Sequence, residues 1–363
     1  MTQSVFLNGR FLSQSVTGVQ RFSGEITAAI DRLMGSGDWP ETTVLTPPAC
    51  NSGNRSAAAA FQRLRVQDVG HRHGHLWEQT DLPKAARGGT LVSLGNTAPV
   101  LAGRRQVVVI HDAGVFDTPD SYSFRFRVWY KTLQRALVRT GAHVVTVSQF
   151  SRDRIVARLG LDPARVAVMY EGADHILRVP ADPDALERHG LRPRQFALVV
   201  GSRVAHKNLA ALQETAAVLE QRGMVIAIVG GSNADVFQDG RMGGLTERRL
   251  GRATDGELRA LYENAACLLF PSRYEGFGLP PVEAMACGCP VLASRGGAVE
   301  EICGDSALYF SGDDRRSIST AVERLLDEPG LASGLSERGR VRAASLSWDA
   351  SARKLADIVR RAC

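Results

Sequence analysis

The 363-residue chain contains no apolar run that approaches the roughly 20 residues a membrane-spanning helix needs. Its six cysteines are scattered without the spacing of a disulfide framework, and no second Cys or His pair accompanies Cys287 and Cys289 at the distance of a zinc site. The start of the chain lacks the basic and apolar regions of a signal peptide. We therefore expect a protein of the reducing cytoplasm that holds no metal ion.

Lysine is also scarce and occurs only at positions 84, 131, 207 and 354, so most of the 44 basic residues are arginines. The net charge is +6. A positive charge favours an anionic partner such as a nucleotide, a diphosphate or an anionic membrane. Nucleic acid is not an expected partner, because the chain lacks Lys/Arg-rich blocks, RNA-binding aromatic signatures and zinc fingers. The G-x-G-x-x-G fingerprint is absent as well, which disfavours a nicotinamide dinucleotide.

Short apolar runs alternate with helical patterns in both halves of the chain. Nearly continuous β-branched runs are typical of strands buried on both faces of a parallel sheet. The expected strands are Val5–Asn8, Thr90–Leu94, Gln106–Ile110, His143–Val147, Val166–Met169, Phe196–Val200, Val225–Val229, Cys267–Phe270, Val291–Ala293 and Ala307–Phe310. The expected helices are Val19–Met34, Tyr122–Arg139, Phe150–Leu159, Asn208–Arg222, Asp255–Asn264, Pro281–Cys287, Arg315–Leu326 and one within Trp348–Arg361.

This alternation predicts an α/β protein with two Rossmann-like, doubly wound parallel-sheet domains. A polar, proline-bearing stretch separates the two series of elements. We place the first domain at residues 1–178, a linker at 179–194, the second domain at 195–346, and at 347–363 a C-terminal helix that could pack back on the first domain. Because such sheets bind ligands beyond the carboxyl ends of their strands, we expect a site in an interdomain cleft.

The segment Phe270–Ala293 carries the strongest functional pattern, FPSRYEGFGLPPVEAMACGCPVLA. A strand ends at Phe270, a glycine-containing loop follows, and prolines open a helix whose exposed N–H groups can bind phosphate or hydroxyl oxygens. Glu275 in the loop can accept hydrogen bonds from a sugar, whereas Glu283 could merely complement the helix dipole. The candidate donor-binding residues here are Glu275, Gly276, Phe277, Gly278, Leu279 and Glu283.

A second pattern, Gly201–Asn208, follows the first strand of the second half and reads GSRVAHKN. Arg203 and Lys207 stand four residues apart across a strand-to-helix turn, where both could reach one diphosphate. The alternative is that they are two solvated surface cations.

Two weaker patterns lie in the first half. His111 follows the VVVI strand, together with Asp112, at the end where a ligand would bind; a lone histidine is more often structural. Gly18 precedes the first helix and would let a diphosphate approach the helix N-terminus, although the same turn could be only a tight connection.

The Glu–x7–Glu segment and the Lys-Asn turn resemble the donor site of retaining glycosyltransferases of family four, which have the GT-B fold. This resemblance implies that Glu275 orients the donor sugar, Glu283 holds the ribose, and Arg203 and Lys207 stabilise the leaving diphosphate. It also implies that His111 lies near the transferred sugar. His206 stands where many members of the family have arginine.

The resemblance further implies metal-independent transfer, without a cofactor, of a hexose such as mannose from a nucleotide-diphosphate sugar such as GDP-mannose. The acceptor would be a glycan or a polyprenyl-diphosphate-linked saccharide in surface-polysaccharide biosynthesis. The alternatives are another GT-B enzyme, such as a nucleotide-sugar 2-epimerase, or a non-catalytic sugar-nucleotide-binding module.

Basic residues recur every four positions on the helix expected at Tyr122–Arg139, at Arg127, Lys131, Arg135 and Arg139. A basic amphipathic helix can lie on an anionic membrane, so a peripheral position at the inner face of the plasma membrane is one expectation. The alternative is a surface helix that packs its apolar face into the first domain.

Overall fold

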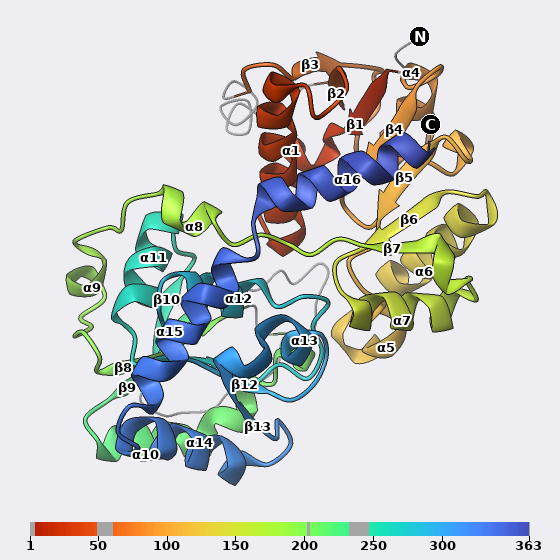
Figure 1. Ribbon diagram of the computed structural model, residues 1–363. Helices are drawn as coiled ribbons and strands as arrows, with labels where there is room; N and C mark the ends of the chain where they lie inside the picture. Colours follow the sequence, from red (N-terminus) through yellow and green to blue (C-terminus); the bar gives the residue numbers. More distant parts are fainter. Residues whose placement is uncertain (1–3, 49–60, 202–203, 232–246, 363) are drawn as a thin grey trace. The chain divides into compact units, whose positions relative to one another are not determined.

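The computed structural model describes residues 4–48, 61–201, 204–231 and 247–362. The chain folds into two compact units (Figure 1). The first unit comprises Met1–Ala113, Val128–Glu171 and Trp348–Cys363, and the second comprises Gly114–Arg127 and Gly172–Ser347. The chain therefore leaves the first unit and returns to it twice.

In the described part of the first unit, seven strands form one parallel sheet in the order β3-β2-β1-β4-β5-β6-β7. The strands are β1 (Val5–Asn8), β2 (Thr42–Thr46), β3 (Arg65–Asp68), β4 (Thr90–Ser93), β5 (Gln106–Val109), β6 (His143–Thr146) and β7 (Val166–Val168). The sheet continues outward in both directions from the β1–β4 pair, which makes this pair the topological switch point of the sheet.

The helices of the first unit connect these strands. They are η1 (Gly9–Ser13), α1 (Gly18–Ser36), α3 (Gly74–Thr80), α4 (Leu82–Ala85), η2 (Val100–Ala102), most of α6 (Phe124–Arg139), α7 (Gln149–Leu159), η4 (Pro163–Arg165) and α16 (Trp348–Ala362). The C-terminal helix α16 packs on α1, where the buried rings of Trp348 and Phe22 meet edge to face at a centroid distance of 5.8 Å. Helix α16 thus completes the core of the first unit.

In the described part of the second unit, six strands form a parallel sheet in the order β10-β9-β8-β11-β12-β13. They are β8 (Phe196–Val200), β9 (Val225–Val229), β10 (Glu247–Gly251), β11 (Cys267–Phe270), β12 (Val291–Ser294) and β13 (Ala307–Phe310). Here the switch point lies between β8 and β11. The prediction of two Rossmann-like, doubly wound parallel sheets is confirmed.

The second unit has more helical segments than the sequence pattern predicts. They are α5 (Gly114–Asp117), η3 (Pro119–Ser121), α8 (His175–Arg178), α9 (Ala185–Arg188), η5 (Ala205–Lys207), η6 (Leu209–Leu212), α10 (Gln213–Gln221), α11 (Asp255–Asn264), α12 (Leu279–Ala286), α13 (Val299–Cys303), η7 (Gly304–Ser306), α14 (Arg315–Asp327) and α15 (Leu331–Ala344). The single helix expected at Asn208–Arg222 is instead the 3-10 turn η6 followed by α10, and Asn208 itself lies outside both in a left-handed conformation with φ of 56°.

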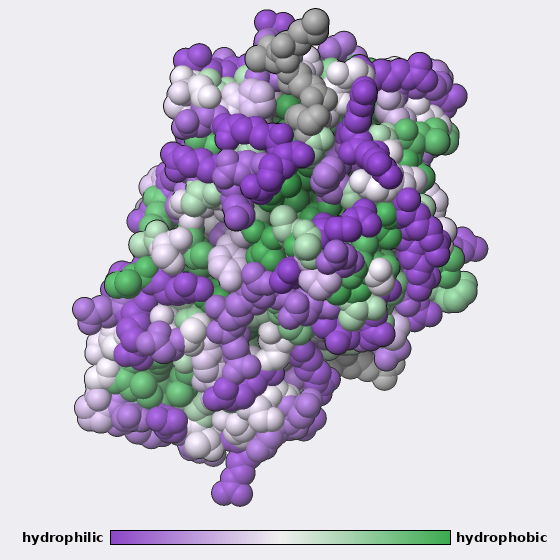
Figure 2. Space-filling model, turned by 45° about the vertical axis from the view of Figure 1, so that its right-hand side comes forward, coloured by the Kyte–Doolittle hydropathy of each residue, from purple (hydrophilic) through white to green (hydrophobic). Residues whose placement is uncertain are grey.

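The surface is mixed in polarity. On the face shown in Figure 2, hydrophilic residues cover much of the surface and hydrophobic residues lie between them. Of the helices that the structure describes, none combines the length and the apolar character needed to cross a bilayer.

Candidate active site

Lys207 and Glu275 form an ion pair at the carboxyl ends of neighbouring strands in the second unit. Lys207 follows β8 in η5, and Glu275 follows β11. Their Nζ and Oε1 atoms are 2.6 Å apart, and both side chains are largely buried. The Lys207 ammonium also lies 5.3 Å from the centroid of the Phe270 ring, a cation–π distance. The two patterns found in the sequence therefore converge at the switch point of one sheet.

Backbone and amide contacts tie the two loops together beneath this pair. The Arg273 N–H donates to the His206 carbonyl oxygen at 2.8 Å. The buried Asn208 amide donates to the carbonyl oxygens of Pro271, at 3.2 Å, and Gly312, at 2.7 Å. These contacts fix the turn that carries Lys207 against the loop that carries Glu275.

Glycines bring a third loop close to Glu275. A Cβ atom at Gly297, whose φ is +62°, would lie 2.6 Å from the Glu275 nitrogen, so only glycine fits this position. The Ala298 N–H next to it donates to the Glu275 carbonyl oxygen at 3.1 Å. Gly278 also has a positive φ, 97°, and stands at the N-cap of α12. The loop that carries Gly297 and Ala298 therefore packs closely against the Glu275 backbone.

The remaining predicted residues of this loop lie at the start of α12. Gly276 and the buried Phe277 directly precede Gly278, and Leu279 is the first residue of the helix. Their contact with a donor stays a prediction. Arg203 lies outside the described residues.

Glu283 is buried in α12, where both of its carboxylate oxygens accept hydrogen bonds. His175 Nε2 lies 2.9 Å from Oε1, and the Tyr262 hydroxyl donates to Oε2 at 2.9 Å. Burial raises the pKa of Tyr262 well above its ordinary value, and Glu283 adds to this effect. Tyr262 is therefore a permanent donor to Glu283, and a ribose would have to share a carboxylate that is already held in place.

His111 lies at the carboxyl end of β5 in the first unit and is almost fully buried. Its Nε2 lies 2.9 Å from the Leu94 carbonyl oxygen, and its Nδ1 lies 3.4 Å from Glu171 Oε1. Burial lowers the pKa of His111, but the hydrogen bond and the charge of Glu171 outweigh this effect, so that the pKa is raised. Both ring nitrogens face acceptors, which fits a protonated imidazole.

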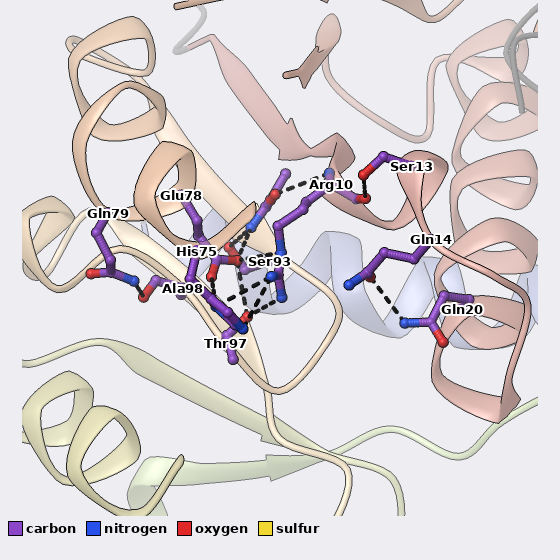
Figure 3. Close-up of polar contacts among 11 residues, drawn as sticks. Arg10, Ser13, Gln14, Gln20, His75, Glu78, Gln79, Ser93, Thr97 and Ala98 are labelled. Atoms are coloured by element: carbon purple, nitrogen blue, oxygen red, sulfur yellow. Dashed lines mark hydrogen bonds and ion pairs between the residues drawn. The ribbon is translucent and has the colours of Figure 1, made fainter. Parts of the chain in front are cut away.

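A buried polar cluster in the first unit holds the loop after β4 (Figure 3). The Glu78 carboxylate accepts hydrogen bonds from Asn8, at 2.8 Å, and Thr97, at 2.9 Å. Arg10 donates to Thr97 at 2.9 Å and pairs with Glu78, while His75 lies 3.3 Å from the other Glu78 oxygen. Burial raises the pKa of Glu78, but His75, Arg10 and Asn8 together lower it overall, so the carboxylate stays ionised.

The same loop then contacts His111. Asn96 accepts a hydrogen bond from the His111 backbone N–H at 2.7 Å, and the Leu94 carbonyl meets its ring. The Arg10–Glu78 cluster therefore fixes Thr97 within the loop that positions His111. Sequence reasoning missed Glu171, His175, Tyr262 and this cluster; the signal available for Glu171 was its place shortly after β7, at the carboxyl end of that strand.

Gly18 is the first residue of α1. Within the described residues, the side chain of the N-cap residue Thr17 does not cap the helix, and a Cβ atom on Gly18 would meet nothing within 4 Å. The helix start is open, and its role in holding a diphosphate stays a prediction. Among the described residues, no group of three or more His, Cys, Asp or Glu side chains could hold a metal ion.

The sequence of the chain matches two known protein families. Residues 187–342 match the family described as glycosyl transferases group 1, and residues 52–176 match glycosyltransferase family 4. The O-antigen chain mannosyltransferase B of Escherichia coli is 30% identical over 259 residues, which cover 68% of this chain and 67% of the relative. The O-antigen chain mannosyltransferase RfbU of Salmonella typhimurium is 28% identical, over 64% of each chain.

Solved structures share the fold. Sucrose-phosphate synthase from Thermosynechococcus elongatus aligns over 99% of both chains with a TM-score of 0.70 and 18% identity. Anabaena HepE in complex with UDP and glucose aligns over 99% of this chain and 100% of its own, with a TM-score of 0.71 and 16% identity. The fold and the family matches together define a glycosyltransferase of the GT-B fold. The chain belongs to glycosyltransferase family 4, group 1, as the sequence resemblance implied.

The close packing around Glu275 predicts a specific effect of Gly297→Ala. The added Cβ would displace the Glu275 backbone, so we expect turnover to fall at least about tenfold because positioning errors of this kind are costly in catalysis. Gly160→Ala is the matched control: its φ is +66° in a left-handed conformation, but nothing lies within 4 Å of the new Cβ. Both variants carry the left-handed strain, of about 1–2 kcal/mol. Steady-state kinetics would contradict the packing argument if the two variants lost activity equally.

The Glu171 contact predicts the protonation of His111. We expect Glu171→Gln to lower the pKa of His111, because only the Leu94 carbonyl and the charge of Asp112 then oppose the effect of burial. In the wild type, the raised pKa adds stability that is present below the unfolded-state pKa and is lost as the pH rises through the folded-state pKa. NMR titration of the imidazole nitrogens measures the His111 pKa in the wild type and in Glu171→Gln. The control is Asp153→Asn, which removes one negative charge from an exposed position. An unchanged His111 pKa in Glu171→Gln would exclude the pairing.

Proposed function

We propose that the enzyme transfers a hexose, with retention of anomeric configuration and without a metal ion or cofactor, from a nucleotide-diphosphate sugar to a saccharide acceptor. The observation that carries this proposal is the Lys207–Glu275 pair, in which a cation and a carboxylate lie side by side at the carboxyl ends of neighbouring strands. Two relatives are O-antigen mannosyltransferases, which supports mannose as the sugar and a role in polysaccharide assembly. We propose GDP-mannose as the donor.

Negative charge develops on the diphosphate as the bond to the anomeric carbon breaks. We propose that Lys207 stabilises this charge together with Arg203, since fixed cations act most strongly where charge appears in the transition state. An ammonium carries three donors, so Lys207 can contact a phosphate oxygen while it still faces Glu275. His206 adds no cation, because burial and then Lys207 lower its pKa to about 4.

The carboxylates have separate proposed roles. Glu275 orients the hydroxyls of the donor sugar, and Glu283, held by His175 and Tyr262, accepts from the ribose hydroxyls. His111 contacts the transferred sugar with a ring whose position Glu171 and Leu94 fix. The start of α1 at Gly18 receives the diphosphate.

We propose that the acceptor is a glycan or a polyprenyl-diphosphate-linked saccharide and that α6 contacts an anionic membrane. The helix buries Leu133 and Leu137 but leaves Phe124 70% and Trp129 40% exposed. Its basic residues Arg125, Arg135 and Arg139 are exposed as well. Aromatic and basic side chains on one exposed helix suit the interface of an anionic bilayer. This contact would hold the enzyme at the inner face of the plasma membrane.

The donor site predicts different effects for its two central residues. We expect Arg203→Ala with Lys207→Ala to weaken GDP binding about 100-fold or more, because two charge-assisted hydrogen bonds of about 1.5–3 kcal/mol are lost. Glu275→Ala should keep GDP affinity but lower turnover about 100-fold, measured as GDP release from GDP-mannose with octyl α-mannoside. Lys354→Ala, an exposed lysine on α16, is the control.

Calorimetry with GDP, UDP and ADP identifies the base that binds. Wild-type affinity in the Arg203/Lys207 double variant would remove the site assignment, and GDP release that does not depend on any acceptor would argue against a transferase.

The membrane proposal predicts that co-sedimentation with phosphatidylglycerol vesicles depends on α6. Phe124→Ser with Trp129→Ser should lower the bound fraction several-fold, because both large apolar side chains are exposed. The control is Leu101→Ser, which removes an 81% exposed leucine outside α6. Equal binding of both variants and the wild type, or no binding to phosphatidylglycerol beyond that to phosphatidylcholine, would refute the contact.

A further inference from the structure

A short segment of the second unit contacts both loops of the candidate donor site. We call residues 117–122 the bridging segment; it runs from the end of α5 through η3. At one end, the Tyr274 hydroxyl donates to Asp117 Oδ2 at 3.2 Å. At the other end, Ser121 Oγ lies 2.9 Å from His206 Nδ1.

The two contacted residues are the direct neighbours of the site residues. Tyr274 precedes Glu275 in the sequence, and His206 precedes Lys207. A stretch of a few residues therefore connects the turn after β8 with the loop after β11, beside the ion pair itself. No sequence pattern singled out this segment.

The contact between the bridging segment and His206 suits an uncharged imidazole. Ser121 is buried, and the Tyr122 ring stacks on His206 at 6.5 Å with an interplanar angle of 23°. Tyr122 in turn stacks on Phe126 at 5.6 Å and 4°. Burial and the charge of Lys207 lower the pKa of His206 to about 4, so the ring is uncharged near neutral pH. His206 therefore acts as a packing and hydrogen-bonding residue here.

The donor itself creates the need for such a connection. A bound diphosphate shares the Lys207 ammonium with Glu275, and this sharing weakens the 2.6 Å ion pair that joins the two loops. The Arg273–His206 backbone hydrogen bond would remain, together with the bridging segment. Loops that are ordered before the ligand arrives bind more tightly, because the ordering entropy is not lost on binding.

We propose that Asp117 and Ser121 are positioning residues for the nucleotide-sugar donor, which they serve by holding the Glu275 and Lys207 loops through Tyr274 and His206. This inference rests on the proposed function, because it presumes that the two loops bind a nucleotide sugar. It adds residues that lie outside both donor-site patterns and that act through Tyr274 and His206.

The test is a double-mutant cycle on the Asp117–Tyr274 contact in the full chain. The ligand is whichever of GDP, UDP and ADP binds the wild type, measured by calorimetry. We expect Asp117→Ala and Tyr274→Phe each to weaken its affinity about 3–10-fold, the range for one lost hydrogen bond. The double variant should bind the nucleotide no more weakly than the single variant with the lower affinity, because the two substitutions remove the same contact.

Two further variants separate positioning from general destabilisation. Asp117→Asn keeps an acceptor oxygen for Tyr274 and should restore most of the affinity. Asp120→Ala removes an exposed carboxylate from the same segment and should bind like the wild type. Ser121→Ala should weaken affinity through the other end of the segment.

The outcomes differ for the inference and for the proposed function. Wild-type affinity in Asp117→Ala and Tyr274→Phe, or effects that multiply in the double variant, would overturn the inference and leave the donor site intact. An equal loss in Asp120→Ala, or lowered melting temperatures with unchanged affinity, would also overturn it. A wild type that binds none of the three nucleotides would instead remove the proposed function, and the inference with it.

Discussion

The ion pair between Lys207 and Glu275 joins two loops that are 68 residues apart in the sequence and that follow neighbouring strands of one sheet. An exposed pair of this kind contributes little to stability, but these side chains are largely withdrawn from water. Without a ligand, each of these buried charges is stabilised by the other. The ion pair therefore keeps both loops in one arrangement. The glycine loop at Gly297, the Asn208 amide and the bridging segment all support that arrangement.

The polar residues buried elsewhere follow the same principle. Glu283 is held by His175 and Tyr262, His111 by Glu171 and Leu94, and the loop after β4 by Arg10 and Glu78. A buried ionised group costs free energy unless its hydrogen bonds are satisfied, and here the partners come from distant parts of the chain. Such satisfied networks specify one geometry, which a binding site for a polar ligand requires.

Most strands with apolar, β-branched sequences were predicted, because burial on both faces leaves a strong pattern; β8, β9 and β11 have the expected bounds. The prediction missed β2, although this strand is largely buried as well. The strands β3 and β10 could not be predicted, because they lie at sheet edges. Their residues, such as Arg65 and Arg248, are polar and exposed. In the site, local spacing identified Glu275 and Lys207. It could not identify partners such as His175, which meets Glu283 across 108 residues, because only the fold creates that proximity.

The discontinuous make-up of the first unit has a consequence for dissecting the protein. A fragment that ends at Glu171 contains the whole first sheet but lacks α16, so it leaves the Phe22 face of α1 uncovered. No single cut in the chain can release this unit with its core complete. An independently folding version would need residues 172–347 removed and the C-terminal helix fused directly behind β7.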